Sequence, residues 1–195
     1  MARNGLNPVR IAGGGYNTGG VNAYAIANGT LTAALFKGDP VMLSAGTVVP
    51  SGGTQTKALG VIRGFFYMDA SNTGKPRFTD QVPVSVSSYN SQSIDGFTSP
   101  VAYVVDDPNA TFQIPSDATV SAGDVGQYFQ VSIGAGSTQS GISNARLNVS
   151  SRSAVSTDRL VKVIGLAKMP GNAWDAASDT VVEVRFVNHQ NRNAI

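Results

Sequence analysis

Only one of the twelve acidic residues in this chain is a glutamate, Glu183, and this imbalance restricts the fold more than any other feature. Twenty-two glycines accompany the aspartates, together with many Ser, Thr and Asn residues. Glu and Lys favour helix interiors, whereas Asp, Asn, Gly and Ser favour turns and caps. The composition therefore predicts strands joined by many turns, with little helix.

Short apolar segments bounded by Gly, Pro, Asn, Asp or Ser recur along the whole chain. They predict about a dozen antiparallel strands, at 8–12, 22–27, 41–43, 47–50, 59–68, 82–87, 101–105, 111–114, 128–133, 145–149, 160–167 and 180–187. In VEVRFV (182–187), apolar and charged residues alternate, so one face should be buried and the other wet or partnered. We expect an all-β sandwich or barrel-like body, with one short helix at 172–178 (NAWDAAS).

Residues 37–69 and 122–169 form a possible pseudo-repeat. Each stretch has a Gly-Asp turn, a short strand, a Gly/Ser-rich hairpin and an apolar strand that contains a glycine. A glycine inside a strand indicates a bulge or a close backbone approach. The matched residues are Gly38-Asp39 with Gly123-Asp124, and Gly60 with Gly165. In the first stretch, Val41 and Leu43 should face the core. The body, 31–195, is then either one domain or two duplicated β lobes.

Charge and cysteine content argue against several classes of partner. The net charge is only +2, and the basic residues are scattered, so no nucleic-acid surface is expected. No run of 18 apolar residues occurs and the first residues lack the apolar core of a signal peptide, so we expect a soluble chain with no membrane partner. Without cysteine, stability must come from packing or from association with other chains.

Residues suited to catalysis or metal binding are scarce. The single histidine, His189, lies in a polar tail and is expected to be solvated, which argues against a His-pair metal site or a Ser-His-Asp relay. Asp106 and Asp107 are adjacent carboxylates in a sequence typical of a turn; a Ca²⁺ site and a general-acid pair are the alternatives. The glycine run at 13–15 lacks the Lys-Ser or Lys-Thr of a phosphate-binding loop. We expect no enzyme activity, cofactor or metal.

Contact surfaces are indicated in two places. Consecutive aromatics at 65–67 put a ring on each face of a strand, where it could cover a second internal layer, contact another protein chain or stack on a sugar. Residues 1–30 hold no acidic residue and many Gly and Asn, so they form an extended arm that orders on a partner, or a frayed terminus with an edge strand. The candidate interface residues are Arg3, Arg10, Tyr16, Tyr24, Phe65 and Tyr67.

Eight segments together carry a resemblance. They are NPVR (7–10), YNTGGVNAY (16–24), ALFKGDPVML (34–43), ALGVIRGFFY (58–67), YVVDDPNATFQI (103–114), GDVGQYF (123–129), VIGLAKMPGNAW (163–174) and VVEVRFVNHQ (181–190). In this order the chain resembles a family of tailed-bacteriophage structural proteins, the small head proteins that decorate or cement the capsid. The resemblance covers nearly the whole chain, but each segment is a turn-and-strand unit and not a catalytic signature.

The resemblance implies a non-enzymatic β-rich protein on the capsid exterior of the virion, made in the host cytoplasm. It also implies that the major capsid protein is the partner and that the chain is a homo-oligomer, often a trimer. A phage fibre or surface adhesin that binds host carbohydrate is the alternative. Such an adhesin would present exposed aromatic rings in a groove.

Overall fold

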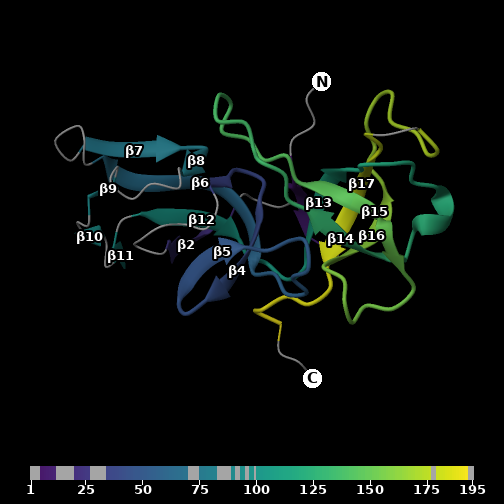
Figure 1. Ribbon diagram of the computed structural model, residues 1–195, viewed down its shortest axis with the longest axis horizontal. Coiled ribbons are helices and arrows are strands. Elements are labelled where there is room, and N and C mark those ends of the chain that lie inside the picture. Colours follow the sequence, from purple (N-terminus) through teal and green to yellow (C-terminus); the bar gives the residue numbers. More distant parts are fainter. Residues whose placement is uncertain are drawn as a thin grey trace.

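The computed structural model describes residues 5–11, 20–26, 34–69, 75–82, 89–90, 93–94, 97–98, 100–176 and 179–192. These residues form antiparallel strands and one 3₁₀ turn, η3 (Ala122–Asp124), so the predicted all-β class is confirmed. Two lobes lie side by side (Figure 1). We call them the first and second lobe, in chain order.

The first lobe is built on one curved sheet. Its five main strands, in the spatial order β2-β12-β6-β4-β5, are β2 (Asn22–Ala25), β12 (Val101–Val105), β6 (Gly60–Asp69), β4 (Pro40–Ser44) and β5 (Thr47–Pro50). β7 (Lys75–Thr79) and β9 (Tyr89–Asn90) pair with the far half of β6. Two small sheets join β3 (Leu35–Phe36) to β8 (Gln81–Val82) and β10 (Ser93–Ile94) to β11 (Phe97–Thr98).

The second lobe contains one six-stranded sheet. In spatial order its strands are β1 (Asn7–Ile11), β13 (Ala110–Pro115), β17 (Val181–Phe186), β16 (Val161–Leu166), β14 (Tyr128–Ser132) and β15 (Arg146–Ser153). The described parts of the predicted N-terminal arm are therefore strands of the body, because β1 pairs with β13 and β2 pairs with β12.

Apart from β1, the two sheets have the same topology. If the five main strands are numbered within each lobe, both sheets have the spatial order first, fifth, fourth, second, third. A parallel bridge then joins the first strand to the third in each lobe, between Ile26 and Val48 and between Ser116 and Leu147. Each sheet is therefore closed on itself as a small barrel.

The two lobes also share an irregularity in the fourth strand. The pairing of β6 with β12 shifts at Arg63, between Ile62 and Gly64. The pairing of β16 with β17 shifts at Ile164, one residue before Gly165. A bulge bends the strand and turns the extra residue out of the regular pattern. By this register Gly165 corresponds to Gly64, whereas the sequence pattern had matched it with Gly60.

Hydrogen bonds place the turn before the second strand in the same way in both lobes. Gly38 and Gly126 have φ of 93° and 91°. Each donates its N–H across 2.9 Å to the fourth strand, Gly38 to the carbonyl of Ile62 and Gly126 to that of Val163. Glycine suits this left-handed conformation because it has no Cβ. The counterpart of Gly38 is thus Gly126, three residues after the glycine that the sequence pattern selected.

Each lobe has its own hydrophobic core, and β6 contributes to both. Ile62 packs in the core of the first lobe, whereas Val61 packs with residues of the second. Val104 and Val105 of β12 divide in the same way. At these residues both faces of the two strands are buried, which joins the lobes into one body.

Most predicted strands and core faces are present. Val41 is fully buried and Leu43 packs, partly buried, on the core of the first lobe. In β17 the side chains of Val182, Val184 and Phe186 are buried as predicted, and Glu183 on the other face has an ion-pair partner. Of the strand expected at 82–87, only residue 82 lies in a described strand, and 83–87 fall outside the described residues.

The sequence analysis was wrong about one helix and missed strands. Residues 172–176 form turns, and Asp175 has φ of 62°. The Asn172 side chain binds the carbonyls of Ala167 and Val181 and the N–H of Val181, so it joins strand ends and does not cap a helix. β7 was not predicted because its sequence, KPRFT, is charged and has almost no buried residue to produce alternation.

Gly60→Ala should destabilise the protein. A Cβ at Gly60 would lie 2.1 Å from the carbonyl oxygen of Val105, so β12 would have to move. We expect a loss of about 1–3 kcal/mol or more, measured by chemical denaturation. Gly165→Ala is the matched control, because no atom lies within 4 Å of a Cβ there. Equal losses in both variants would contradict the close packing at Gly60.

Candidate interaction surface

Two additions distinguish the lobes. Between the fourth and fifth strands, the first lobe has residues 70–100, which include β7 to β11, where the second lobe has only 167–180. Between the second and third strands, the second lobe has residues 133–145, where the first has only 45–46. Figure 1 shows the 133–145 loop, in green, at the junction of the lobes. Additions to a common scaffold are frequent places for binding sites.

The 133–145 loop is attached to the first lobe by several contacts. The Lys37 N–H donates to the carbonyl of Gly141 across 3.2 Å, and the Ser143 N–H donates to the carbonyl of Lys37 across 2.9 Å. A Cβ at Gly136 would lie 2.4 Å from the Phe36 ring, so the loop backbone packs directly on that ring. The loop is therefore held in one position.

The two additions face each other across an open cavity of about 760 Å³, which we call the inter-lobe hollow. Its floor is the bulged part of β6 with β12, and its walls are β7, the segment at 80–81 and the tip of the 133–145 loop. Among the lining residues are Arg63, Tyr67, Arg77, Gln81, Tyr103 and Gln139. These come from parts of the chain that are far apart in sequence, so no short motif encodes the hollow.

The charge around the hollow is positive. Arg63 and Arg77 are exposed, and both line it. Asp80 is the acidic residue among the lining residues, and its carboxylate lies 3.2 Å from the Nζ of Lys37. The side chain of Gln81 donates to the carbonyl of Thr138 across 3.0 Å and so joins the two walls. The site combines cations, phenols and amides in an open, water-accessible shape.

The three consecutive aromatic residues have three different environments. Phe65 is 1% exposed and lies in the core of the first lobe, so the interface role predicted for it is wrong. Phe66 is covered by Phe78 of β7, with ring centroids 4.6 Å apart. Tyr67 lines the hollow, opposite Arg77 in the strand register. Phe78 itself is 73% exposed, an outward-facing ring that the sequence analysis did not select.

The second lobe has a smaller cavity, of about 470 Å³, at the corresponding bulge. Ile164 and Gly165 stand there in place of Arg63 and Gly64, and Glu183 in place of Tyr103. Arg10 of β1 reaches into this cavity and its Nη2 lies 2.6 Å from the Glu183 carboxylate. Arg10, a predicted interface residue, thus forms an ion pair within the chain.

Asp106 joins three segments of the chain. Its carboxylate accepts hydrogen bonds from Asn22 and Tyr24 of β2 and from Asn191 near the C-terminus. Burial, and then the nearby Asp106 carboxylate, raise the pKa of the Tyr24 hydroxyl to about 12. Tyr24, predicted as an anchor for a partner, is therefore half-buried and bound inside the molecule.

The prediction that Asp106 and Asp107 form a turn is confirmed. The Asp107 carboxylate accepts the N–H of Asn109 across 2.7 Å, and its carbonyl accepts that of Ala110 across 3.0 Å. These are the bonds expected of an Asp at the start of a turn. Within the described residues, no three His, Asp or Glu side chains gather as a metal site would require.

His189 is buried, so the prediction of a solvated histidine is wrong. Its side chain is 5% exposed, and burial lowers its pKa. The surrounding tail crosses onto the first lobe: the amide of Gln190 forms hydrogen bonds with both the N–H and the carbonyl of Leu43, and the Ala58 N–H donates to Asn188. The segment is polar in sequence because it is attached through hydrogen bonds of the Gln190 amide and of the backbone, and not through apolar side chains.

Of the predicted interface residues, Tyr67 and Phe65 line the hollow, although Phe65 is only 1% exposed. Arg3 and Tyr16 lie outside the described residues. Sequence reasoning missed Arg63, Arg77 and Tyr103. The available signal was the glycine after Arg63, which indicates a bulge, but nothing in the sequence placed β7 or the 133–145 loop beside it.

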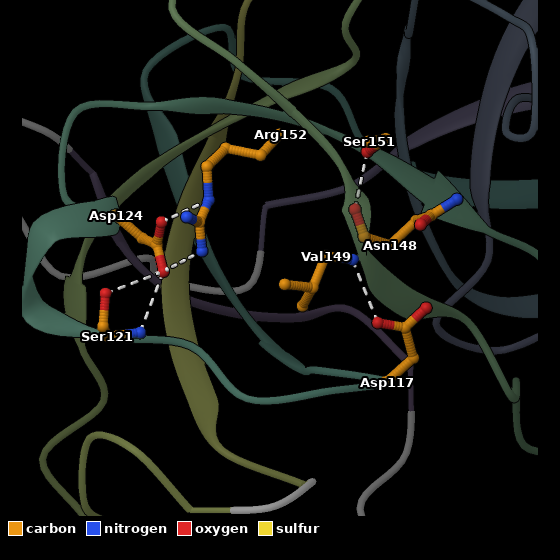
Figure 2. A network of polar contacts seen from close by, with 7 residues as sticks. All are labelled: Asp117, Ser121, Asp124, Asn148, Val149, Ser151 and Arg152. Carbon is orange, nitrogen blue, oxygen red and sulfur yellow. Dashed lines mark hydrogen bonds and ion pairs between the residues drawn. The ribbon is translucent and has the colours of Figure 1, made fainter.

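Buried aspartates stabilise the turns before β4 and β14. Asp39 is 1% exposed and its carboxylate accepts the N–H of Phe36 across 2.8 Å. Asp124 is also 1% exposed and accepts the N–H of Ser121 across 2.8 Å. Figure 2 shows that Asp124 has a further partner, Arg152 of β15, whose Nε lies 2.6 Å from Oδ1 and whose Nη2 lies 2.9 Å from Oδ2.

Figure 2 also shows that neighbouring parts of β15 are tied to the same region. The Val149 N–H donates to the Asp117 carboxylate across 2.9 Å, and the Ser151 hydroxyl donates to the Asn148 carbonyl across 2.6 Å. The Val149–Asp117 bond, like the Arg152–Asp124 pair, connects β15 to the segment between β13 and β14, whereas the Ser151–Asn148 bond lies within β15. The network stabilises the second lobe and lies outside the set of residues that line the inter-lobe hollow.

Comparisons with protein-family models, with curated proteins and with solved structures found no match. Among the described residues, there is no helix with the length and apolar character needed to span a bilayer.

Asp39→Asn should flatten the dependence of stability on pH. Burial raises the pKa of Asp39 from 3.8 to about 6. The hydrogen bonds from Ser143 and Phe36 lower this pKa, but their effect is smaller than that of burial. Because the folded state holds the proton more tightly, this group stabilises the fold below about pH 4, and up to about 3 kcal/mol is lost as pH rises through 6. Asn stays neutral and can still accept the Phe36 N–H. Melting temperatures between pH 4 and 8 test this.

The control for that series is Asp158→Asn, at an exposed site. It should keep the pH dependence of the parent protein. Parallel curves for the parent and Asp39→Asn would contradict the assignment.

Arg152→Ala should lower the free energy of unfolding by about 1–3 kcal/mol, because it removes two hydrogen bonds from a buried carboxylate. Arg152→Lys should recover only part of this loss, since a lysine cannot form the two-point contact. Urea denaturation gives both values. If Lys restores full stability, the paired geometry contributes nothing beyond the charge.

Proposed function

We propose that the chain is a non-enzymatic virion structural protein that decorates and cements a tailed-phage capsid by binding the outer surface of the shell formed by the major capsid protein. It is made in the host cytoplasm and acts as a homo-oligomer, with a trimer favoured. The class of protein comes from the resemblance of its strand and turn segments to small phage head proteins. The structure adds a physical rationale for such a role.

The observation that carries the proposal is the inter-lobe hollow. It is open, positive and lined by arginine and tyrosine side chains, on a body whose lobes share buried strands. Arg and Tyr are enriched where proteins bind one another tightly. A rigid body that carries such a surface suits a protein that links neighbouring subunits, because weak contacts repeated over a shell add together.

The chemistry of the carboxylates fits the same role. Asp106 joins separate segments of the chain, and Asp107 stabilises a turn. Asp39 and Asp124 also stabilise turns. Glu183 forms an ion pair with Arg10. Each of these acidic groups thus has an evident structural task in the fold.

A carbohydrate-binding adhesin is the second candidate. Tyr67, Tyr103 and the amides of Gln81 and Gln139 line the hollow, and tyrosine rings with amides are groups that bind sugars. The aromatic residues do not form a flat platform, since the Phe78 ring contacts Phe66 at an interplanar angle of 50°. We therefore rank this function second.

The test is co-sedimentation of the purified protein with phage heads that lack it, at low and moderate salt. We expect saturation at a fixed number of copies per head, because equivalent capsid sites are limited in number. Binding should weaken as salt increases, since cations at the hollow contribute. Absence of binding to any head, together with binding to a glycan array, would favour the adhesin.

A further inference from the structure

We propose that the inter-lobe hollow is the docking surface itself, and that it takes an extended acidic segment of the partner protein, whose carboxylate pairs with Arg63. This inference rests on the proposed function for the identity of the partner, but the chemistry of recognition is argued from the hollow alone.

The first step is the position of Arg63. It is the extra residue of the β6 bulge, is exposed, and lines the hollow. A bulge re-aims a side chain relative to its neighbours in the strand. Within the described part of the chain, Arg63 forms no ion pair, whereas Asp80, the lining carboxylate, is paired with Lys37. A cation is therefore available to a ligand at the floor of the hollow.

The second step is the comparison between lobes. At the corresponding bulge of the second lobe, Glu183 supplies a carboxylate and Arg10 binds it. In the first lobe the strand position equivalent to Glu183 is Tyr103, a neutral phenol. The second lobe thus contains an arginine–carboxylate pair within its own chain, with the arginine supplied by β1 and Ile164 at the bulge position. The first lobe has an arginine at the bulge position itself and no acid at the facing strand position. A partner's Asp or Glu would complete the pair.

The third step is the shape and composition of the site. Small-molecule sites are usually enclosed and mostly apolar, whereas this hollow is wide and open and is lined by Arg77, Tyr67 and Gln139 as well as Arg63. Side chains of these types bind the carboxylates and the backbone amides of an extended peptide. The loop at 133–145 forms one wall and is already anchored on the first lobe, so little ordering is needed on binding.

The decisive experiment compares charge reversals. The test variants are Arg63→Glu alone and the double variant Arg63→Glu with Arg77→Glu. The control is the double variant Lys57→Glu with Lys168→Glu. It changes the net charge of the protein by the same amount as the arginine double variant, at exposed sites outside the lining of the hollow. Melting temperatures identify any variant that fails to fold. Arg63→Glu is the cleaner variant because Arg63 has no described partner to lose.

Two binding assays are run on each protein. The first is co-sedimentation with undecorated phage heads. The second is fluorescence anisotropy with a labelled peptide of six glutamates around a central phenylalanine, with the all-glutamine peptide as the control probe. We expect Arg63→Glu to weaken both interactions at least tenfold, the lysine control to change neither by more than about twofold, and the glutamine peptide not to bind.

The outcomes separate this inference from the proposed function. If the parent binds heads and Arg63→Glu binds them equally well, the hollow is not the docking surface, although decoration stands. If the parent binds no heads but binds the acidic peptide through Arg63, the recognition chemistry stands and the capsid role fails. If neutral oligosaccharides bind in the hollow and the acidic peptide does not, the inference is wrong and the adhesin function is favoured.

Discussion

The burial of both faces of β6 and β12 where the two lobes meet is the constraint on which the rest of the structure depends. Ile62 and Val104 fill the barrel of the first lobe, while Val61 and Val105, their neighbours in the chain, pack against the second. Two barrels that share strands in this way cannot rotate freely against each other, because movement would expose both cores. The hollow above these strands therefore has a fixed shape, which a docking surface needs.

The polar groups of the chain reinforce that junction. The tail after β17 crosses to the first lobe through Gln190 and Asn191, and Asp106 collects bonds from β2 and from the tail. With a charged fraction of only 13%, the chain has few ionisable groups, and several of them hold turns or join segments, among them Asp39, Asp124 and the Arg146–Asp179 pair. Arg63, exposed at the β6 bulge, forms no ion pair within the part of the chain that the structure describes, so no internal ion pair accounts for its position.

The comparison between the two lobes indicates which surface of the molecule is the candidate for binding. A shared topology means that differences between corresponding positions reflect different uses of the same frame. The second lobe closes its bulge cavity with an internal ion pair, and the first lobe leaves a larger cavity bordered by additions from both lobes. These additions make the two halves of the molecule unequal, and the proposed docking surface lies at that difference.

The sequence by itself determined the fold class, most strands, the buried faces of β4 and β17, and the turn at Asp106-Asp107, because alternation and turn chemistry are local properties. It did not reveal that Phe65 is internal, that His189 is buried, or that Gly38 corresponds to Gly126, since these follow from strand register and from packing between distant segments. The hollow was decided by tertiary structure alone. Its residues come from β6, β7, the segment at 80–81, β12 and the 133–145 loop, and only closure of two barrels around shared strands brings them together.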